Sequence, residues 1–159
     1  MTIRVICVGR LKERFYEEAV SEFVKRLSRY ASVELIEVAD EKAPERLSGA
    51  EREQVKLEEG RRILAKLDKN DFAVALAIEG KELSSLALAE SMQAWMNEGK
   101  GSFAFLIGGS LGLSAEVLSR ANYLLSFGKM TFSHQVFRVM LLEQLYRAFK
   151  IMNNEPYHK

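Results

Sequence analysis

A set of side chains that could carry acid–base chemistry or bind a polar ligand lies near the carboxyl-terminal end of the chain. They are Lys129, Thr131, Ser133, His134, Arg138, Arg147, Tyr157 and His158. Residues 127–159 hold 5 Lys/Arg and 2 Asp/Glu, and a local positive excess favours a phosphate-rich partner. Tyr157 and His158 can stack on a base or share a proton. The alternative is a solvated, frayed chain end.

A glycine-rich segment is the second candidate site. Residues 107–113 read Ile-Gly-Gly-Ser-Leu-Gly-Leu and stand between an apolar run and a helix start, where a glycine turn lets a ligand approach the backbone. The spacing matches neither the dinucleotide-binding pattern nor the P-loop. This argues against NAD and ATP, and the segment taken alone equally fits a tight strand-to-helix turn.

Other common chemistries are not indicated. The two histidines, His134 and His158, have no neighbouring cysteine or histidine at metal-ligand spacing, so no metal is predicted. The single cysteine, Cys7, lies in an apolar run, which predicts a buried structural thiol in a reducing compartment.

Length and composition predict one globular domain, residues 1–159. The chain is 48% hydrophobic and 28% charged, enough to bury a core without disulfides or metals. Its net charge of +1 gives no global attraction to nucleic acid or membrane. The first apolar run is too short for a signal peptide or a membrane span, so a cytoplasmic protein without a membrane partner is expected.

Hydrophobic periodicity predicts alternating strands and helices. Strands are expected at 3–8, 33–38, 72–78, 103–107 and 123–127. Helices are expected over 15–30, from the capping box at Ser48 to about 67, over 85–97, from Ser114 onward, and over 134–152. This alternation predicts an α/β fold with a largely parallel sheet flanked by helices.

The last predicted helix, His134–Met152, is apolar around nearly its whole circumference. Such a helix must be covered on all sides, either inside one chain or by a second copy. Because a small domain has limited surface for covering it, we expect a homodimer. Its few charges, Arg138, Glu143, Arg147 and Lys150, are expected to be paired or functional.

Several motifs taken in order resemble one family closely. They are Val8–Lys12, Ile107–Gly112, Leu125–Phe132, His134-Gln135, Arg138-Val139, Glu143-Gln144, Tyr146–Ala148 and Tyr157–Lys159. The sequence resembles, over its whole length, the family of bacterial ribosomal large subunit methyltransferase H, which is of the SPOUT class.

The resemblance implies a SPOUT-type α/β fold with a trefoil knot in the C-terminal part, a rare exception to unthreaded topology, and a homodimer. It also implies methyl transfer from S-adenosyl-L-methionine to N3 of a pseudouridine in 23S rRNA of the assembled ribosome. The cofactor pocket implied by position comprises Leu76, Gly108, Phe127, Gly128, Lys129, Met130, Thr131 and Phe132. Knot-loop backbone groups would bind the adenine between apolar side chains.

Roles at the tail follow from the resemblance and from residue chemistry. His158 is the expected acceptor of the N3 proton, Tyr157 stacks on or orients the base, and Arg147 contacts a phosphate or fixes the tail. The tail and basic residues are expected to come from one protomer and the cofactor from the other.

The sequence departs from the family at Ser133, where proline is usual. Serine does not fix φ, so a less rigid loop and a lower cofactor affinity are expected. Two other functions remain open. One is a noncatalytic ribosome-binding knot protein, and the other is a nucleotide-phosphate enzyme that uses residues 108–112 as an anion site.

Overall fold

Five parallel strands form one sheet in the computed structural model, which describes residues 1–42 and 44–159. They are β1 (Thr2–Val8), β2 (Ser32–Val38), β3 (Phe72–Glu82), β4 (Ser102–Ile107) and β5 (Tyr123–Ser126). The strand order is β2-β1-β4-β3-β5, and every neighbouring pair is parallel. The predicted α/β class with a parallel sheet is confirmed.

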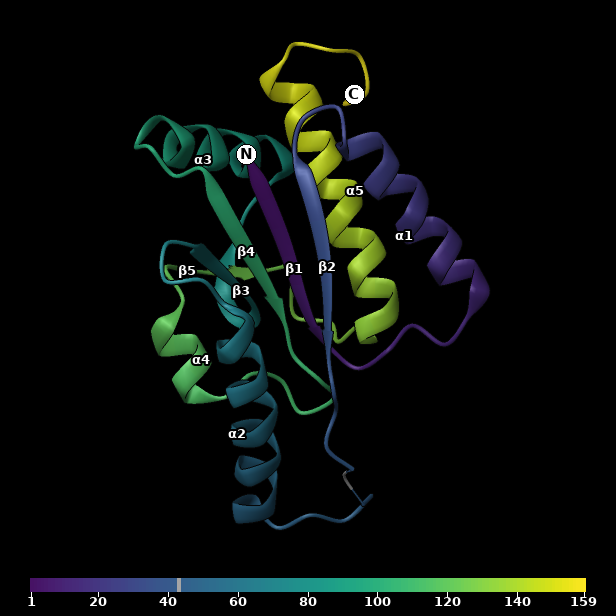
Figure 1. The fold of residues 1–159 in the computed structure, drawn as a ribbon, viewed down its shortest axis with the longest axis vertical. Coiled ribbons are helices and arrows are strands. Elements are labelled where there is room, and N and C mark those ends of the chain that lie inside the picture. The colour runs from purple at the N-terminus through teal and green to yellow at the C-terminus, as the bar shows by residue number, and fades with distance from the viewer. Residues whose placement is uncertain (43) are drawn as a thin grey trace.

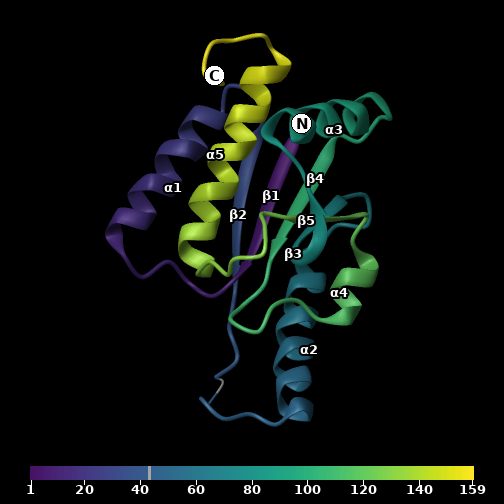
Figure 2. The same cartoon turned by 180° about the vertical axis from the view of Figure 1, so that it is seen from behind.

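Helices cover both faces of this sheet (Figures 1 and 2). They are α1 (Arg14–Leu27), α2 (Gly49–Lys66), α3 (Ser85–Asn97), α4 (Ala115–Arg120) and α5 (His134–Met152). Side chains of α1, α3 and α5 share one buried cluster, and side chains of α2 and α4 share a second. The two clusters are separated by the strands, so the fold has three layers.

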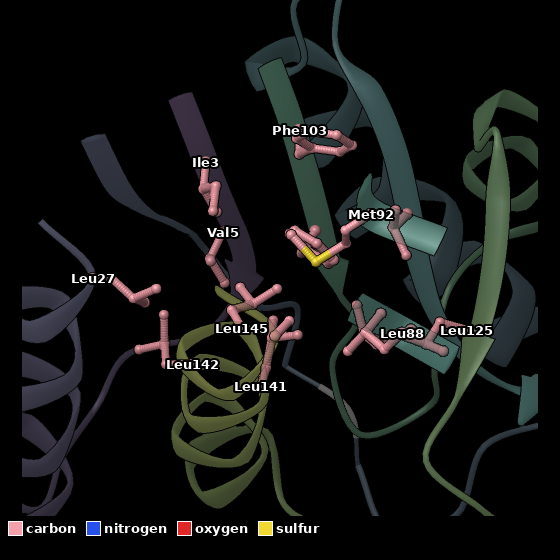
Figure 3. Close-up of a cluster of buried hydrophobic side chains, with 14 of the residues drawn as sticks. Ile3, Val5, Leu27, Leu88, Met92, Phe103, Leu125, Leu141, Leu142 and Leu145 are labelled. Atoms are coloured by element: carbon pink, nitrogen blue, oxygen red, sulfur yellow. The ribbon is translucent and has the colours of Figure 1, made fainter. Parts of the chain in front are cut away.

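Successive side chains of the central strands belong alternately to these two clusters. In β1, Ile3 and Val5 belong to the α1/α3/α5 side, whereas Ile6 and Val8 belong to the α2/α4 side. Successive strand residues point to opposite faces, and both faces are covered, so an uninterrupted apolar run is required. Figure 3 shows the first cluster, where Leu141, Leu142 and Leu145 of α5 lie near strand residues.

Serine side chains begin four of the helices. Ser48, Ser84, Ser114 and Ser133 each accept a hydrogen bond from the backbone N–H three residues later. Ser48 also forms the predicted capping box with Glu51. These bonds satisfy donors that the first helical turn leaves free, which explains where the helices start.

The helix α5 packs between α1 and α3 (Figure 2). Its fully buried side chains are Arg138, Leu141, Leu142, Leu145, Ala148 and Phe149, and its remaining residues are partly exposed. Helices of the same chain therefore provide much of the cover that the sequence argument assigned to a second copy.

A buried carboxylate ties three strands together at the amino edge of the sheet. Asp71, just before β3, accepts hydrogen bonds from Arg4 at 2.7 and 2.8 Å and from the Ser102 hydroxyl at 2.5 Å. Burial by itself raises the pKa of Asp71, but the hydrogen bonds from Ser102, the Asp68 N–H and Arg4 hold that pKa below its ordinary value.

The Cys7 thiol is buried in β1, on the side of the sheet that faces α1, α3 and α5. Burial raises its pKa to about 12, because an apolar surrounding disfavours the thiolate. The thiol therefore packs as a small apolar group, as predicted.

Candidate active site

Strands β4 and β5 end at the carboxyl edge of the sheet, on either side of the middle of β3. Leu76 of β3 pairs with Leu125 of β5, and the residue before it pairs with Leu106 of β4. Gly108 and Phe127 directly follow β4 and β5. The register therefore brings three of the predicted cofactor residues, Leu76, Gly108 and Phe127, to one edge.

The strand β3 is longer than predicted and irregular beside this edge. It continues to Glu82, beyond the expected end at residue 78, and its pairing with β5 shifts register between Leu76 and Lys81. A Cβ placed on Gly80 would lie 2.7 Å from the backbone of Leu124. Only glycine allows this close approach, and the sequence analysis did not single it out.

The glycine turn is packed against itself and against α2. A Cβ on Gly108 would lie 2.8 Å from the backbone of Gly112, and Gly112 has a φ of +87°. A Cβ on Gly109 would lie 2.9 Å from the Glu59 carboxyl group. Close packing within the protein therefore requires glycine at 108 and 109 before any ligand is considered.

The loop after β5 presents apolar side chains to the surface. The Ser126 hydroxyl accepts from the Gly128 N–H at 3.1 Å, and Gly128 has a φ of +112°. Beyond it, residues 129–133 are exposed, with Met130 77% and Phe132 36% accessible. Exposed apolar side chains beside free backbone groups could enclose a planar ring.

Ser133 has a structural role that the sequence analysis did not assign. It is the N-cap of α5, its φ is −62°, and its hydroxyl accepts from the Val136 N–H at 3.4 Å. Proline would fit this φ but would remove the cap. The expected loss of loop rigidity is therefore opposed by a hydrogen bond that only the serine provides.

A cavity of about 550 Å³ lies between the end of β5, the start of α3 and the middle of α5. It is lined by Phe23, Glu82, Leu83, Ser84, Ser85, Leu88, Leu125, Ser126, Phe127, Gly128, Val139, Met140, Glu143 and Gln144. Phe127 and Gly128 of the predicted cofactor set line it. Leu76, Gly108 and residues 129–132 do not.

The three predicted catalytic residues lie together, around Arg147. Its guanidinium contacts the Nδ1 atom of His158 at 3.2 Å and lies 4.7 Å from the ring centroid of Tyr157. It also donates to Glu143 Oε1 at 2.5 Å. The Tyr157 hydroxyl donates to the same oxygen at 3.0 Å.

Glu143 joins this cluster to the cavity, because it lines the cavity and binds both Arg147 and Tyr157. Burial raises the pKa of Tyr157, and the hydrogen bond to Glu143 raises it further. The hydrogen bond to Glu143 also raises the pKa of Arg147. The sequence marked Glu143 as a charge needing a partner but did not assign it to the site.

Arg147 contacts Nδ1 of His158. Because arginine has only donors, this contact is a hydrogen bond only when Nδ1 is the acceptor. Arg147 therefore lies against a nitrogen that the proposed chemistry could use.

The end of the chain is folded back beside α5 (Figure 1). Asn154 adopts a φ of +53° after the helix, a common way to end helices. Glu155 then accepts from Lys150 at 2.7 Å and from the Tyr30 hydroxyl at 2.8 Å. The structure favours an ordered tail over the frayed alternative.

Arg138 is paired within the fold. Its side chain is 3% exposed and donates to Glu37 at 2.7 Å and to the Gly9 carbonyl at 2.7 Å. It also contacts Nδ1 of His134 at 3.3 Å. These contacts fasten the start of α5 to the ends of β1 and β2.

Within residues 1–42 and 44–159, no cluster of three or more His, Cys, Asp or Glu side chains is arranged to hold a metal ion. Over the same residues, no helix has the length and apolar composition required to cross a bilayer.

A family model described as "Predicted SPOUT methyltransferase" matches residues 1–158. The chain belongs to the SPOUT methyltransferase family. Two solved structures resemble this SPOUT methyltransferase in fold. A probable methylase family protein from Haemophilus influenzae Rd KW20 is 16% identical, with a TM-score of 0.52, over 99% of this chain and 70% of that one.

The second structure is the tRNA (m1G37) methyltransferase from Aquifex aeolicus, which is also 16% identical. Its TM-score is 0.54, over 92% of this chain and 70% of that chain. At such identity the likeness concerns the fold alone. SPOUT methyltransferases generally use S-adenosyl-L-methionine.

Proposed function

We propose that this SPOUT methyltransferase transfers a methyl group from S-adenosyl-L-methionine to N3 of a pseudouridine in 23S rRNA of the assembled ribosome, in the cytoplasm. One observation carries the proposal. Arg147 and Tyr157 both bind Glu143, which lines the same cavity as Phe127 and Gly128, and His158 contacts Arg147. Groups that handle a proton thus lie beside groups that fit a methyl donor, in a family of methyltransferases.

The residues present fit an adenosyl cofactor. The cavity volume lies in the range of small-molecule sites, and the 127–132 loop offers apolar side chains and backbone groups. Phe127 and Gly128, which line the cavity, would hold the cofactor together with Leu76, Gly108 and residues 129–132, which lie outside the cavity lining. The sulfonium of the cofactor supplies an electrophilic methyl carbon. Because methyl transfer is an in-line displacement, alignment of the two substrates is the main task of the site.

The target N3 carries a proton that must leave. We assign its acceptance to Nδ1 of His158, which is free once Arg147 turns toward an RNA phosphate. Tyr157, held by Glu143, orients the base. Binding of RNA would in this way expose Nδ1 of His158, the proton acceptor that the reaction needs.

A homodimer is part of the proposal. Apolar side chains remain exposed on β3, on α3 and on the loop after β5, namely Ile78 at 55%, Leu86 at 50% and Met130 at 77%. A second copy over this region would cover them and could supply the tail to a cofactor held by its partner. Leu86→Lys should then yield monomers in analytical ultracentrifugation, whereas a dimeric variant would remove this region from the interface.

We further propose that residues 1–159 act as one domain, and that the chain from β4 to α5 is threaded as a trefoil knot. The glycine turn and the 127–132 loop, which follow neighbouring strands β4 and β5, would form the knotted part. An experimental backbone trace tests the threading directly.

The decisive experiment treats assembled ribosomes and naked 23S rRNA, both unmethylated at the target, with protein and S-adenosyl-L-methionine. Mass spectrometry of nuclease digests should find 3-methylpseudouridine in the ribosome sample. Methyl transfer to a different nucleoside would overturn the proposed substrate but not the methyltransferase.

The two alternatives make different predictions. A noncatalytic ribosome-binding protein would show no S-adenosyl-L-methionine binding in calorimetry. A nucleotide-phosphate enzyme would bind phosphate at residues 108–112, but the buried Glu59 carboxyl group beside Gly109 makes that turn unfavourable for an anion.

A further inference from the structure

Two consecutive residues of α2 lie directly against the glycine turn. Glu59 fills the space where a Cβ of Gly109 would be, with Oε1 and Oε2 at 2.9 and 3.0 Å. A Cβ on Gly60 would collide with the Ser114 hydroxyl at the end of the same segment. Residues 109–114 thus pack against α2 at both ends. The contact with Ser114 explains why α2 contains a glycine at position 60.

The Glu59 carboxyl group is unusual among the buried polar groups. It is 4% exposed, and burial raises its pKa. Oε2 accepts from the Glu41 N–H at 3.1 Å, but Oε1 has no partner. Over the described residues, the only other buried side-chain atom without one is Nε of Arg138, whose remaining nitrogens are bonded.

An unpartnered buried carboxyl oxygen destabilises the folded state. A glutamine would bury more easily, because a neutral amide has no charge to desolvate. Retention of such a group is typical of residues that serve function at some expense of stability. Glu59 contacts the glycine turn at Gly109, and this turn also contains Gly108.

We propose that Glu59 is a positioning residue for methyl transfer. It sets how closely the turn approaches β1 and α2, and thereby places Gly108 beside the cofactor. The inference rests on the proposed function, since Gly108 is a cofactor contact only there. Glu59 itself touches neither the cofactor nor the RNA.

The test compares Glu59→Gln with Glu58→Gln, the neighbouring residue of α2 that pairs with Arg61 near the surface. In Glu59→Gln we expect faster hydrogen exchange at the amides of residues 109–113. We also expect about a tenfold rise in the Kd for S-adenosylhomocysteine and in the KM for S-adenosyl-L-methionine, because small misplacements weaken such contacts strongly. The kcat and the melting temperature should not fall, and Glu58→Gln should match the wild type.

A double-mutant cycle tests the same contact from the other side. Gly109→Ala should weaken S-adenosylhomocysteine binding in the wild-type background, because its methyl group collides with Glu59. In the Glu59→Ala background the same change should weaken binding less, because the carboxyl oxygens are gone and only Val8 Cγ1, at 3.2 Å from the added Cβ, remains close. Equal effects in both backgrounds would overturn the inference.

The two proposals fail in different ways. Unchanged turn exchange and unchanged cofactor affinity in Glu59→Gln, with a wild-type protein that binds S-adenosylhomocysteine, overturn the role of Glu59 alone. A wild-type protein that does not bind it overturns the proposed function and, with it, this inference.

Discussion

Arg147 holds the groups that the proposed reaction depends on. Through Glu143 it is coupled to Tyr157, and it also contacts Nδ1 of His158. A lysine could not reproduce this, because its single ammonium lacks the planar fork that reaches both partners. In the proposed reaction, Arg147 must leave Nδ1 before that atom accepts the N3 proton.

His158→Ala tests this site most directly. We expect methylation to fall about 10²- to 10⁴-fold, the usual contribution of a general base. Calorimetry should show unchanged S-adenosylhomocysteine binding, because His158 does not line the cavity. Lys159→Ala is the matched control at the neighbouring position. Full methylation by His158→Ala would remove the imidazole from the mechanism.

Ser133→Pro separates the two effects of serine at the start of α5. Loss of the cap costs about 1 kcal/mol, and restriction of the unfolded chain by proline restores up to about 1 kcal/mol. The φ of −62° is compatible with proline, so thermal unfolding should show little net change and cofactor affinity should stay the same. Clearly tighter cofactor binding would instead support the expectation that serine loosens the loop.

At the scale of elements, the sequence predicted every strand and helix because each has a local signal. Apolar runs marked the strands, helical spacing marked the helices, and serines marked the helix starts at Ser48 and Ser114. Gly80 and Glu59 had no such signal. Each matters through a contact with a residue distant in sequence, Leu124 and Gly109 respectively, and a single sequence does not reveal such pairs.

Asp71 links three strands, and its contribution should depend on pH. Because its folded pKa is lowered, the carboxylate stabilises the fold above its unfolded pKa of about 4, and this stability is lost as the pH falls through the folded pKa. Asp71→Asn should therefore reduce the free energy of unfolding by about 2–3 kcal/mol at pH 7. Urea titrations should show this difference narrowing at acidic pH. A difference independent of pH would mean that the charge of Asp71 is unimportant.

The tail and α5 should be separable in function. Removal of residues 157–159 leaves Asn154 and Glu155, which hold the end of α5 through Lys150 and Tyr30. We expect a shortened chain that keeps its circular dichroism spectrum and melting temperature but no longer methylates ribosomes. Retained turnover would refute the role of Tyr157 and His158 together.

In the whole molecule, the apolar surface of α5 does not by itself require a second copy of the chain. An all-round apolar α5 suggested a partner copy, but α1 and α3 flank it within one chain. Periodicity shows that a helix is covered, not which chain covers it. The exposed side chains of Ile78, Leu86 and Met130 now support the proposed second copy.

The overall charge bears on RNA selection. With a net charge of +1, nonspecific attraction to phosphates is small. Filter binding should therefore show weak association with naked 23S rRNA and much stronger association with assembled ribosomes. Tight, strongly salt-dependent binding to naked RNA would contradict this and would require a larger basic surface.

The inert thiol of β1 has a practical consequence for following the enzyme in solution. Cys7 is the one cysteine in the sequence, and with a pKa of about 12 in a buried position it does not form the thiolate that maleimide dyes attack. A cysteine introduced at Lys159 would therefore be labelled alone, without removal of any native residue from the core. The emission of a fluorophore at that position would report in real time whether the tail moves when ribosomes are added.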